Sequence, residues 1–321
     1  MKKVFSFLFI AFFIAGIGSC TKEPTLAEVK EALIQGLTED ISADSLHSYV
    51  KWMEDMGTRF CLADNRREVA VAIQEKFISF GYASARLDSF LLERTYRDNY
   101  YSLWQYNVIA RLEGSLYPDS LSIMGGHYDS ILGGSDSDPF TSAPGANDNA
   151  SGVAAALEVA RVMKENNFRP EGSILFIAFA AEELGLYGSR DYCIKAAREQ
   201  AKIKMMLNND MIAYEPSADM ASWKANIMDY ENSATLPDDA MRLAARHTIL
   251  DTYTDNSLNR YSDSFSFSEY GYPALFFFKD ADDSSYHSLN DITDNCNFTY
   301  CREIVKISAA LLAERNIYNK Q

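Results

Sequence analysis

The stretch ILFIAFAAEELGLYGS, residues 174–189, decides the fold that the sequence predicts. Its first seven residues are continuously apolar, as in a buried strand. Glu182 and Glu183 follow side by side where this strand ends. Like charges repel, and the end of a buried strand is poorly solvated, so the pair costs free energy unless a positive charge lies beside it. One interpretation of the acid pair is that it binds a cation. The other is that the two acids only stabilise the start of the following helix.

Alternating strand and helix patterns on both sides of this stretch predict an α/β fold. Helical patterns cover residues 150–164 and 185–199, and strand patterns lie at 105–113, 120–126, 174–180, 203–209 and in YPALFFFK at 272–279. Strands interleaved with helices predict a three-layer α/β/α sandwich with a mostly parallel central sheet. Periodic apolar positions in residues 21–80 predict additional N-terminal helices.

The composition predicts one domain and argues against nucleic acid as a partner. The chain has 321 residues, of which 47% are hydrophobic, and this is enough for one large core. Its formal charge is −15, and it has no run rich in Lys and Arg that would bind phosphates. We find no internal repeat and no interdomain linker, so residues 41–321 are expected to form a single domain.

The N-terminus, MKKVFSFLFIAFFIAGIGSC, predicts export from the cytoplasm. Its apolar stretch is shorter than a membrane-spanning helix, so residues 1–19 are expected to be a signal peptide. The ending IGSC resembles a bacterial lipobox, which implies acylation of Cys20, with residues 20–40 as lipid tether and N-terminal segment. Thr21 then points to the outer membrane of a Gram-negative cell, where the protein is periplasmic or surface-exposed. A plain secretory signal is the alternative.

The remaining cysteines do not predict a metal site. Cys61, Cys193, Cys296 and Cys301 lack CxxC spacing. In an oxidising compartment Cys296 and Cys301 could pair across a short loop, but their spacing leaves this open.

Polar side chains gather at the ends of the predicted strands, where α/β sheets carry their sites. Only four histidines occur in the chain, and two of them, His127 and His287, follow predicted strands. Asp129 lies two residues after His127 and can orient its imidazole. Asp148 precedes the helix at 150–164, where it either binds a metal or caps the helix. Asp210 follows the strand at 203–209. His47 and His247 lie on predicted helices and are interpreted as surface or packing residues.

Two imidazoles and several carboxylates are ligands suited to zinc. Two zinc ions a few ångström apart would share a central carboxylate, as in two-metal hydrolases. The sequence therefore predicts a zinc site at the carboxyl ends of the strands. The predicted set consists of His127, Asp148, Asp210, His287 and one acid of the Glu182–Glu183 pair, with Asp129 beside His127.

From about residue 105 to the C-terminus, the sequence resembles the zinc aminopeptidases of peptidase family M28. The motifs that carry the resemblance are GGHYDS at 125–130, PGANDNASG at 144–152, EELGLYGS at 182–189, NND at 208–210 and YHSLND at 286–291. The resemblance implies a zinc-exopeptidase-like fold, peptide substrates with a free N-terminus, and two zinc ions per chain. It further implies that His127 and Asp210 bind one zinc, Glu183 and His287 the other, and Asp148 both.

The same resemblance assigns Glu182 as general base and Asp129 as the residue that orients His127. Zinc lowers the pKa of a bound water, and an adjacent carboxylate can take its proton and pass it to the leaving amine. Glutaminyl-peptide cyclotransferases share this fold but hold a single zinc, so cyclisation is an alternative function. A non-catalytic peptide-binding lipoprotein is a third possibility.

The chain departs from the family pattern near residue 260. Ser262, Asp263 and Ser264 stand where many members have Ser-Asp-His. The tyrosine that assists the oxyanion in characterised members aligns with Asn259, although Tyr261 is close by. Oxyanion assistance therefore has no residue assigned to it from the sequence.

Overall fold

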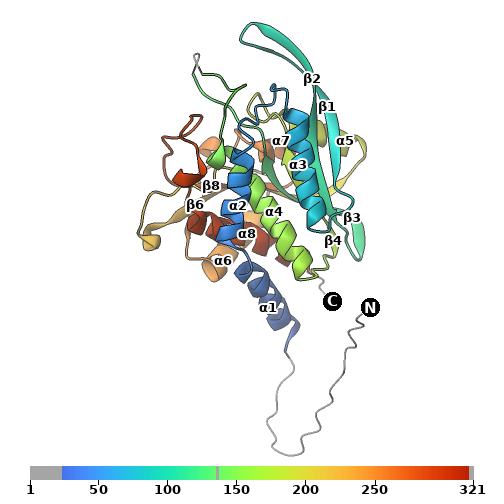
Figure 1. Cartoon of the computed structure of the whole chain (residues 1–321). Coiled ribbons are helices and arrows are strands. Elements are labelled where there is room, and N and C mark those ends of the chain that lie inside the picture. The colour runs from blue at the N-terminus through green and yellow to red at the C-terminus, as the bar shows by residue number, and fades with distance from the viewer. Residues whose placement is uncertain (1–23, 135–136, 318–321) are drawn as a thin grey trace, which may run out of the picture.

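The computed structural model describes residues 24–134 and 137–317. The predicted signal peptide and Cys20 lie outside these residues. At the centre of the fold is an eight-stranded sheet with the strand order β1-β2-β4-β3-β5-β8-β6-β7 (Figure 1). The strands are β1 Arg86–Tyr96, β2 Asn99–Leu112, β3 Tyr117–His127, β4 Gly172–Phe179, β5 Lys202–Asn209, β6 Lys224–Met228, β7 Asp251–Tyr253 and β8 Ala274–Lys279.

The middle of the sheet is parallel, whereas its flanks are mixed. β3 pairs in parallel with β4 and β5, and β5 pairs in parallel with β8. β2 runs antiparallel to both β1 and β4, and β6 runs antiparallel to β8. This arrangement confirms the predicted three-layer α/β fold. The carboxyl ends of β4, β3, β5 and β8 consequently meet at one edge.

Strand β4 shows why the sheet needs helices on both faces. All eight of its residues are buried, and successive side chains point to opposite faces. Ile174 and Phe176 belong to the larger core cluster, and Leu175 and Ile177 belong to the smaller one. Two separate cores, one on each side of the sheet, follow from this alternation.

The helices divide between these two cores. α5 Tyr187–Arg198 and α7 Asp263–Glu269 cover the smaller core. The helices that contribute to the larger core are α1 Leu26–Glu39, α2 Ala43–Glu54, α3 Arg66–Ser79, α4 Ser151–Glu165, α6 Leu236–His247 and α8 Phe298–Glu314. The first three confirm the helices expected before residue 80. Short helical turns lie at η1 Ala146–Ala150, η2 Met220–Ser222, η3 Asn256–Leu258 and η4 Thr293–Asn295.

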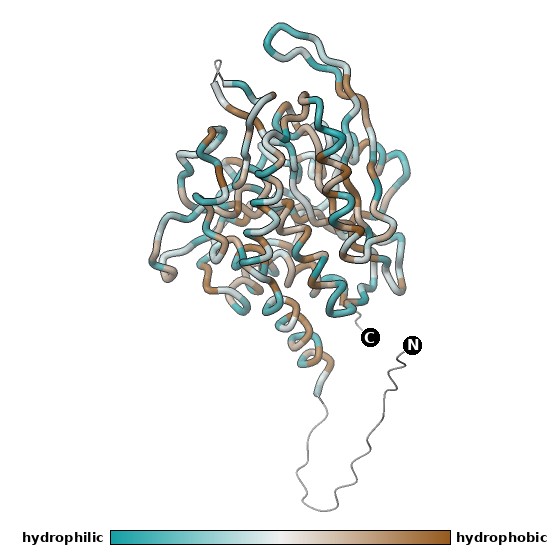
Figure 2. The backbone as a smooth tube through the Cα atoms, viewed as in Figure 1, coloured by the Kyte–Doolittle hydropathy of each residue, from teal (hydrophilic) through white to brown (hydrophobic). Residues whose placement is uncertain are grey.

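The main difference from the sequence prediction is the hairpin of β1 and β2, which extends beyond the body of the molecule (Figure 1). β1 was not predicted, and β2 begins at Asn99, earlier than the expected residue 105. In β1 only Phe90 and Leu92 are buried, so the strand lacks a continuous apolar run. The outer part of the hairpin is largely hydrophilic in Figure 2, because it projects away from the core.

Cys296 and Cys301, whose pairing the sequence left open, are free thiols in the structure.

Among residues 24–134 and 137–317, no helix is both long and apolar enough to cross a bilayer.

Candidate metal centre

The five predicted ligand side chains lie together at the carboxyl edge of the parallel strands. His127 is the last residue of β3, and Asp210 directly follows β5. Glu183 lies in the turn after β4, and His287 lies in the loop after β8. Asp148 belongs to η1, immediately before α4. The topology brings them together because β4, β3, β5 and β8 are adjacent and parallel.

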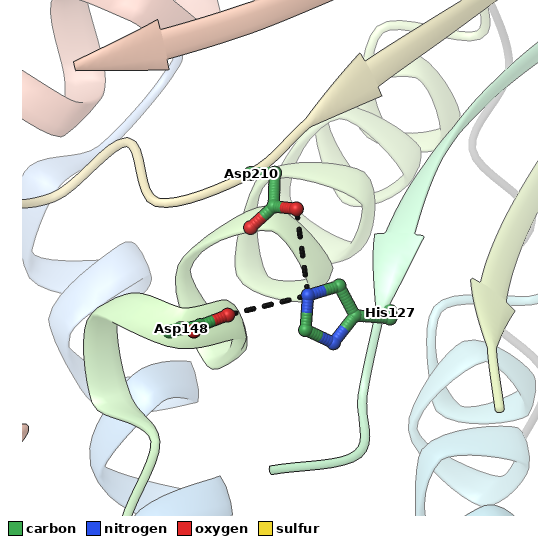
Figure 3. A group of neighbouring side chains, drawn as sticks. All are labelled: His127, Asp148 and Asp210. Atoms are coloured by element: carbon green, nitrogen blue, oxygen red, sulfur yellow. Dashed lines mark ion pairs between the residues drawn. The ribbon is translucent and has the colours of Figure 1, made fainter. Parts of the chain in front are cut away.

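Asp148 stands between the two imidazoles. Its Oδ1 lies 3.3 Å from His127 Nε2, and its Oδ2 lies 3.1 Å from His287 Nε2. His127 Nε2 also lies 3.4 Å from Asp210 Oδ2, and His287 Nε2 also lies 2.9 Å from Glu183 Oε2. In Figure 3 the carboxylates of Asp148 and Asp210 point to the same ring nitrogen of His127. Two three-residue groups therefore share Asp148.

The spacing of these atoms fits zinc. Ligand atoms about 2.0–2.1 Å from a zinc ion at tetrahedral angles are roughly 3.3 Å apart, close to the four distances within the cluster. Glu183 Oε1 and Asp210 Oδ1 are buried, yet they have no hydrogen-bond partner among the described residues. Buried polar atoms are normally satisfied, so unpartnered oxygens gathered at one place fit a site for a cation.

The electrostatics of the cluster also favour a cation. In the protein without bound metal, burial raises the pKa of Glu183 to about 8 and that of Asp263 to about 7. Burial also raises the pKa of Glu182 well above its ordinary value. Burial opposes the charged form of His287, but Asp148 and Glu183 outweigh it and raise the pKa of this imidazole to about 10. Protons are thus held where metal ions would otherwise supply the positive charge.

We expect the zinc-free protein to lose stability as the pH rises from about 5 to about 8. The folded pKa values of Glu183, Asp263 and His287 lie above their ordinary values, so the folded state binds more protons than the unfolded chain. The free energy of unfolding then falls as these protons leave. The lowered pKa of Asp148, where hydrogen bonds from His127 and His287 outweigh burial, acts only in more acidic solution.

Thermal unfolding of chelator-treated protein at several pH values measures this effect. Zinc should restore stability most strongly at the alkaline end, because its ligands bind in their deprotonated forms. A midpoint temperature that rose between pH 5 and pH 8 in the chelated protein would contradict these pKa directions.

Asp129 contacts more than the imidazole that it was predicted to orient. His127 Nδ1 lies 3.1 Å from the Asp129 backbone carbonyl and 3.6 Å from its carboxylate. The two carboxylate oxygens accept hydrogen bonds from the backbone N–H groups of Glu182 (3.0 Å) and Glu183 (3.3 Å). The buried side chain of Asp129 therefore fixes the backbone of Glu182 and Glu183 and also lies beside the imidazole of His127.

Ser262 holds Asp210 in a similar way. Its hydroxyl donates to Asp210 Oδ2 at 2.6 Å and accepts a hydrogen bond from the Asn208 side chain. Asp263 is fully buried, and neither of its carboxylate oxygens has a hydrogen-bond partner within the described part of the chain. The segment that departs from the family pattern thus packs directly against the cluster.

A cavity of about 510 Å³ opens beside the cluster and is lined by His127, Asp148, Glu182, Glu183 and Asp210, together with Tyr261 and Tyr286. Tyr261 is 73% exposed. The side-chain amide of Asn259 donates a hydrogen bond to the backbone carbonyl of Asp229, and neither residue lines the cavity. His47 and His247 are not part of either ligand group.

Tyr286 is a cavity residue that was not predicted from the sequence. Its ring stacks on His287 with centroids 3.7 Å apart and planes 22° apart. Its position beside a predicted ligand in YHSLND was the available signal, but nothing in the sequence showed that the ring would face the cavity.

The fold and the cluster together define an α/β protein with a shared carboxylate–imidazole centre at the carboxyl edge of a parallel sheet. Residues 107–312 match the model of peptidase family M28, and the chain belongs to this family. This confirms the resemblance found in the sequence.

Similar proteins agree with this membership. A probable zinc metalloprotease of Pyrenophora tritici-repentis is 31% identical over 233 residues, which are 67% of this chain and 52% of that protein. A probable aminopeptidase of Saccharomyces cerevisiae is 30% identical over 220 residues, which are 65% of this chain and 57% of that protein. This chain spans about half the length of the curated relatives it matches.

Solved structures share the fold at low sequence identity. The LapA aminopeptidase of Legionella pneumophila superposes with a TM-score of 0.75 at 19% identity, covering 90% of this chain and 76% of LapA. A glutaminyl cyclase of Fimbriiglobus ruber gives a TM-score of 0.70 at 17% identity, covering 85% of this chain and 95% of the cyclase.

Proposed function

We propose that this protein is a zinc-dependent aminopeptidase that holds two zinc ions and removes N-terminal residues from peptides. The observation that carries the proposal is the position of Asp148, whose two carboxylate oxygens face two different imidazoles. The names of the relatives support zinc and peptide hydrolysis.

Each proposed metal position has three protein ligands. His127, Asp210 and Asp148 would hold one zinc ion, and Glu183, His287 and Asp148 would hold the other. Zinc at these positions supplies Lewis acidity, which acidifies a water molecule and polarises a peptide carbonyl.

Glu182 is the proposed general base. Its Oε2 lies 3.9 Å from His127 Nε2, and its carboxylate lines the cavity. The hydrogen bond from its backbone N–H to Asp129 fixes the turn on which it stands. Glu182 takes the proton of the attacking water and delivers it to the leaving amine, while adjacent cations favour its ionised form. The acidic cavity suits the cationic α-amine of a peptide.

Tyr286 is the proposed donor to the developing oxyanion. Burial raises the pKa of its phenol, and the carboxylates of Asp148, Glu183 and Asp210 act in the same direction, so the hydroxyl keeps its proton. Replacing Tyr286 by Phe should lower kcat by about 10²- to 10³-fold and change KM little. Tyr261→Phe is the matched control. Steady-state kinetics that showed the larger loss for Tyr261→Phe would transfer the role to Tyr261.

Aminoacyl anilides and glutaminyl peptides test the proposed reaction against its alternatives. We expect release of the aniline and no cyclised product. The cyclase shares the fold, so cyclisation with one zinc per chain would favour a glutaminyl-peptide cyclotransferase. Peptide binding without either product would favour a non-catalytic binding lipoprotein.

We also propose, from the sequence alone, that the protein is exported and anchored through an acylated Cys20, in the outer membrane of a Gram-negative cell. Residues 41–321 would form the peptidase domain. Metabolic labelling with a fatty acid should be lost in Cys20→Ala. Labelling that persisted in that variant would contradict the anchor.

A further inference from the structure

Arg59 is a buried arginine that the proposed mechanism does not use. It lies between α2 and α3, in the N-terminal part of the chain, and is 1% exposed. Its guanidinium donates four hydrogen bonds to backbone carbonyls. Nε donates to Tyr128 (2.8 Å), Nη1 to Met53 (3.2 Å) and Pro144 (2.7 Å), and Nη2 to Gly145 (2.6 Å).

Three of these carbonyls belong to segments that carry site residues. Tyr128 stands between His127 and Asp129, and Pro144 and Gly145 begin the turn that ends at Asp148. A guanidinium has five N–H groups in a rigid planar fork, so four bonds to fixed carbonyls define its orientation. Arg59 therefore connects the segment of one imidazole ligand to the segment of the shared carboxylate.

Asp291 holds the same turn from the other end. It is 3% exposed, and its Oδ1 and Oδ2 accept hydrogen bonds from the backbone N–H groups of Asn147 (2.7 Å) and Asp148 (3.0 Å). Its own carbonyl accepts a hydrogen bond from the Ala146 N–H at 3.0 Å. Arg59 thus binds the carbonyls of residues 144 and 145, and Asp291 binds the N–H groups of residues 146–148.

The packing around the turn leaves no room for a side chain at residue 145. Gly145 has φ +53°, and a Cβ there would lie 2.8 Å from Arg59 Nη2 and 2.5 Å from Ser130 Cβ. Real Cβ atoms essentially never show contacts of this length, so a side chain at residue 145 would have to displace the guanidinium or Ser130.

The charge of Arg59 also acts on the cluster. Within the described residues, no carboxylate lies within ion-pair distance of its guanidinium, although a buried charge is costly without compensation. The carboxylates that compensate it at longer range are those of Asp291, Asp129, Asp148 and Glu183. Arg59 is therefore a buried positive charge that backbone carbonyls hold in place and that carboxylates of the candidate site compensate at longer range.

We propose that Arg59 and Asp291 form a clamp that positions Asp148 so that its two oxygens reach both metal ions. Both are positioning residues, since neither lines the cavity beside the cluster. The inference rests on the proposed function, because the clamp acts by positioning a zinc ligand.

Zinc affinity of Arg59→Lys and Asp291→Asn tests the clamp. Asp291→Asn keeps the shape of the side chain but cannot accept both N–H bonds, and Arg59→Lys keeps the positive charge but loses the planar fork that binds four carbonyls. Chelator competition should show zinc affinity lowered by about 10- to 100-fold in both variants. Arg161→Met is the control, because Arg161 makes two hydrogen bonds with the buried Glu158 on the far part of α4. This control should lose stability and keep its zinc affinity. Wild-type zinc affinity in Arg59→Lys and Asp291→Asn would overturn the clamp.

Amide hydrogen exchange provides a readout that does not depend on metal. In zinc-free Asp291→Asn, exchange should become faster in residues 144–150 and stay unchanged in β4, if the clamp holds this turn. Exchange that rose evenly along the chain would show a general structural role and would overturn the proposal. A wild-type protein with fewer than two zinc ions would contradict the proposed function instead. In that case the exchange experiment alone would show whether Arg59 and Asp291 hold the turn.

Discussion

Replacing Glu182 by Gln is expected to lower kcat by about 10²- to 10⁴-fold while both zinc ions are retained. The amide has nearly the shape of the carboxylate but cannot accept the proton of the attacking water. Glu182 does not belong to either group of candidate ligands, so its loss should leave the metal positions complete. Steady-state kinetics and elemental analysis on the same preparation measure the two effects together.

Glu183→Gln is the matched variant, because it changes the neighbouring residue in the same way. Glu183 Oε2 lies 2.9 Å from His287 Nε2, so this variant should lose zinc from one position. A Glu182→Gln protein that lost metal and kept its rate would show that the roles of the two acids are exchanged.

Replacing Asp148 by Ala should have the largest effect on metal content. Both donor groups contain Asp148, and without it each keeps two side chains: His127 with Asp210, and Glu183 with His287. Zinc sites in proteins generally use three or four protein ligands, so both positions should lose zinc. We expect less than one zinc ion per chain. The rate of hydrolysis should fall by at least about 10³-fold, because Glu182 and Tyr286 would act without the Lewis acid that zinc supplies.

Asp119→Ala is a suitable control for this experiment, since Asp119 is exposed on β3 and lies outside the cluster. It should keep wild-type zinc content and activity. Retention of two zinc ions in Asp148→Ala, measured by elemental analysis after dialysis, would rule out a shared carboxylate.

The candidate ligands could be predicted from the sequence because of a simple topological rule. In a parallel sheet the carboxyl ends of neighbouring strands meet at one edge, and polar residues after apolar runs are easily recognised. His127, Glu183 and Asp210 follow such runs within a few residues, so their convergence required only the strand assignments. The central strands were predictable because burial on both faces demands continuous apolar sequence.

Other features depend on contacts that no local pattern records. Arg59 reaches the turn before Asp148 from a segment 86 residues away, and Asp291 reaches it from 144 residues away. Both residues act on backbone groups, which carry no sequence signature. The edge strand β1 was missed for a related reason, since an edge strand buries few side chains and its pattern resembles that of a polar loop.

Anomalous diffraction at the zinc edge tests the central claim most directly. We expect two peaks, one between His127 and Asp210 and the other between Glu183 and His287, with Asp148 coordinating both. A single peak, or strong peaks that Asp148 does not contact, would contradict it.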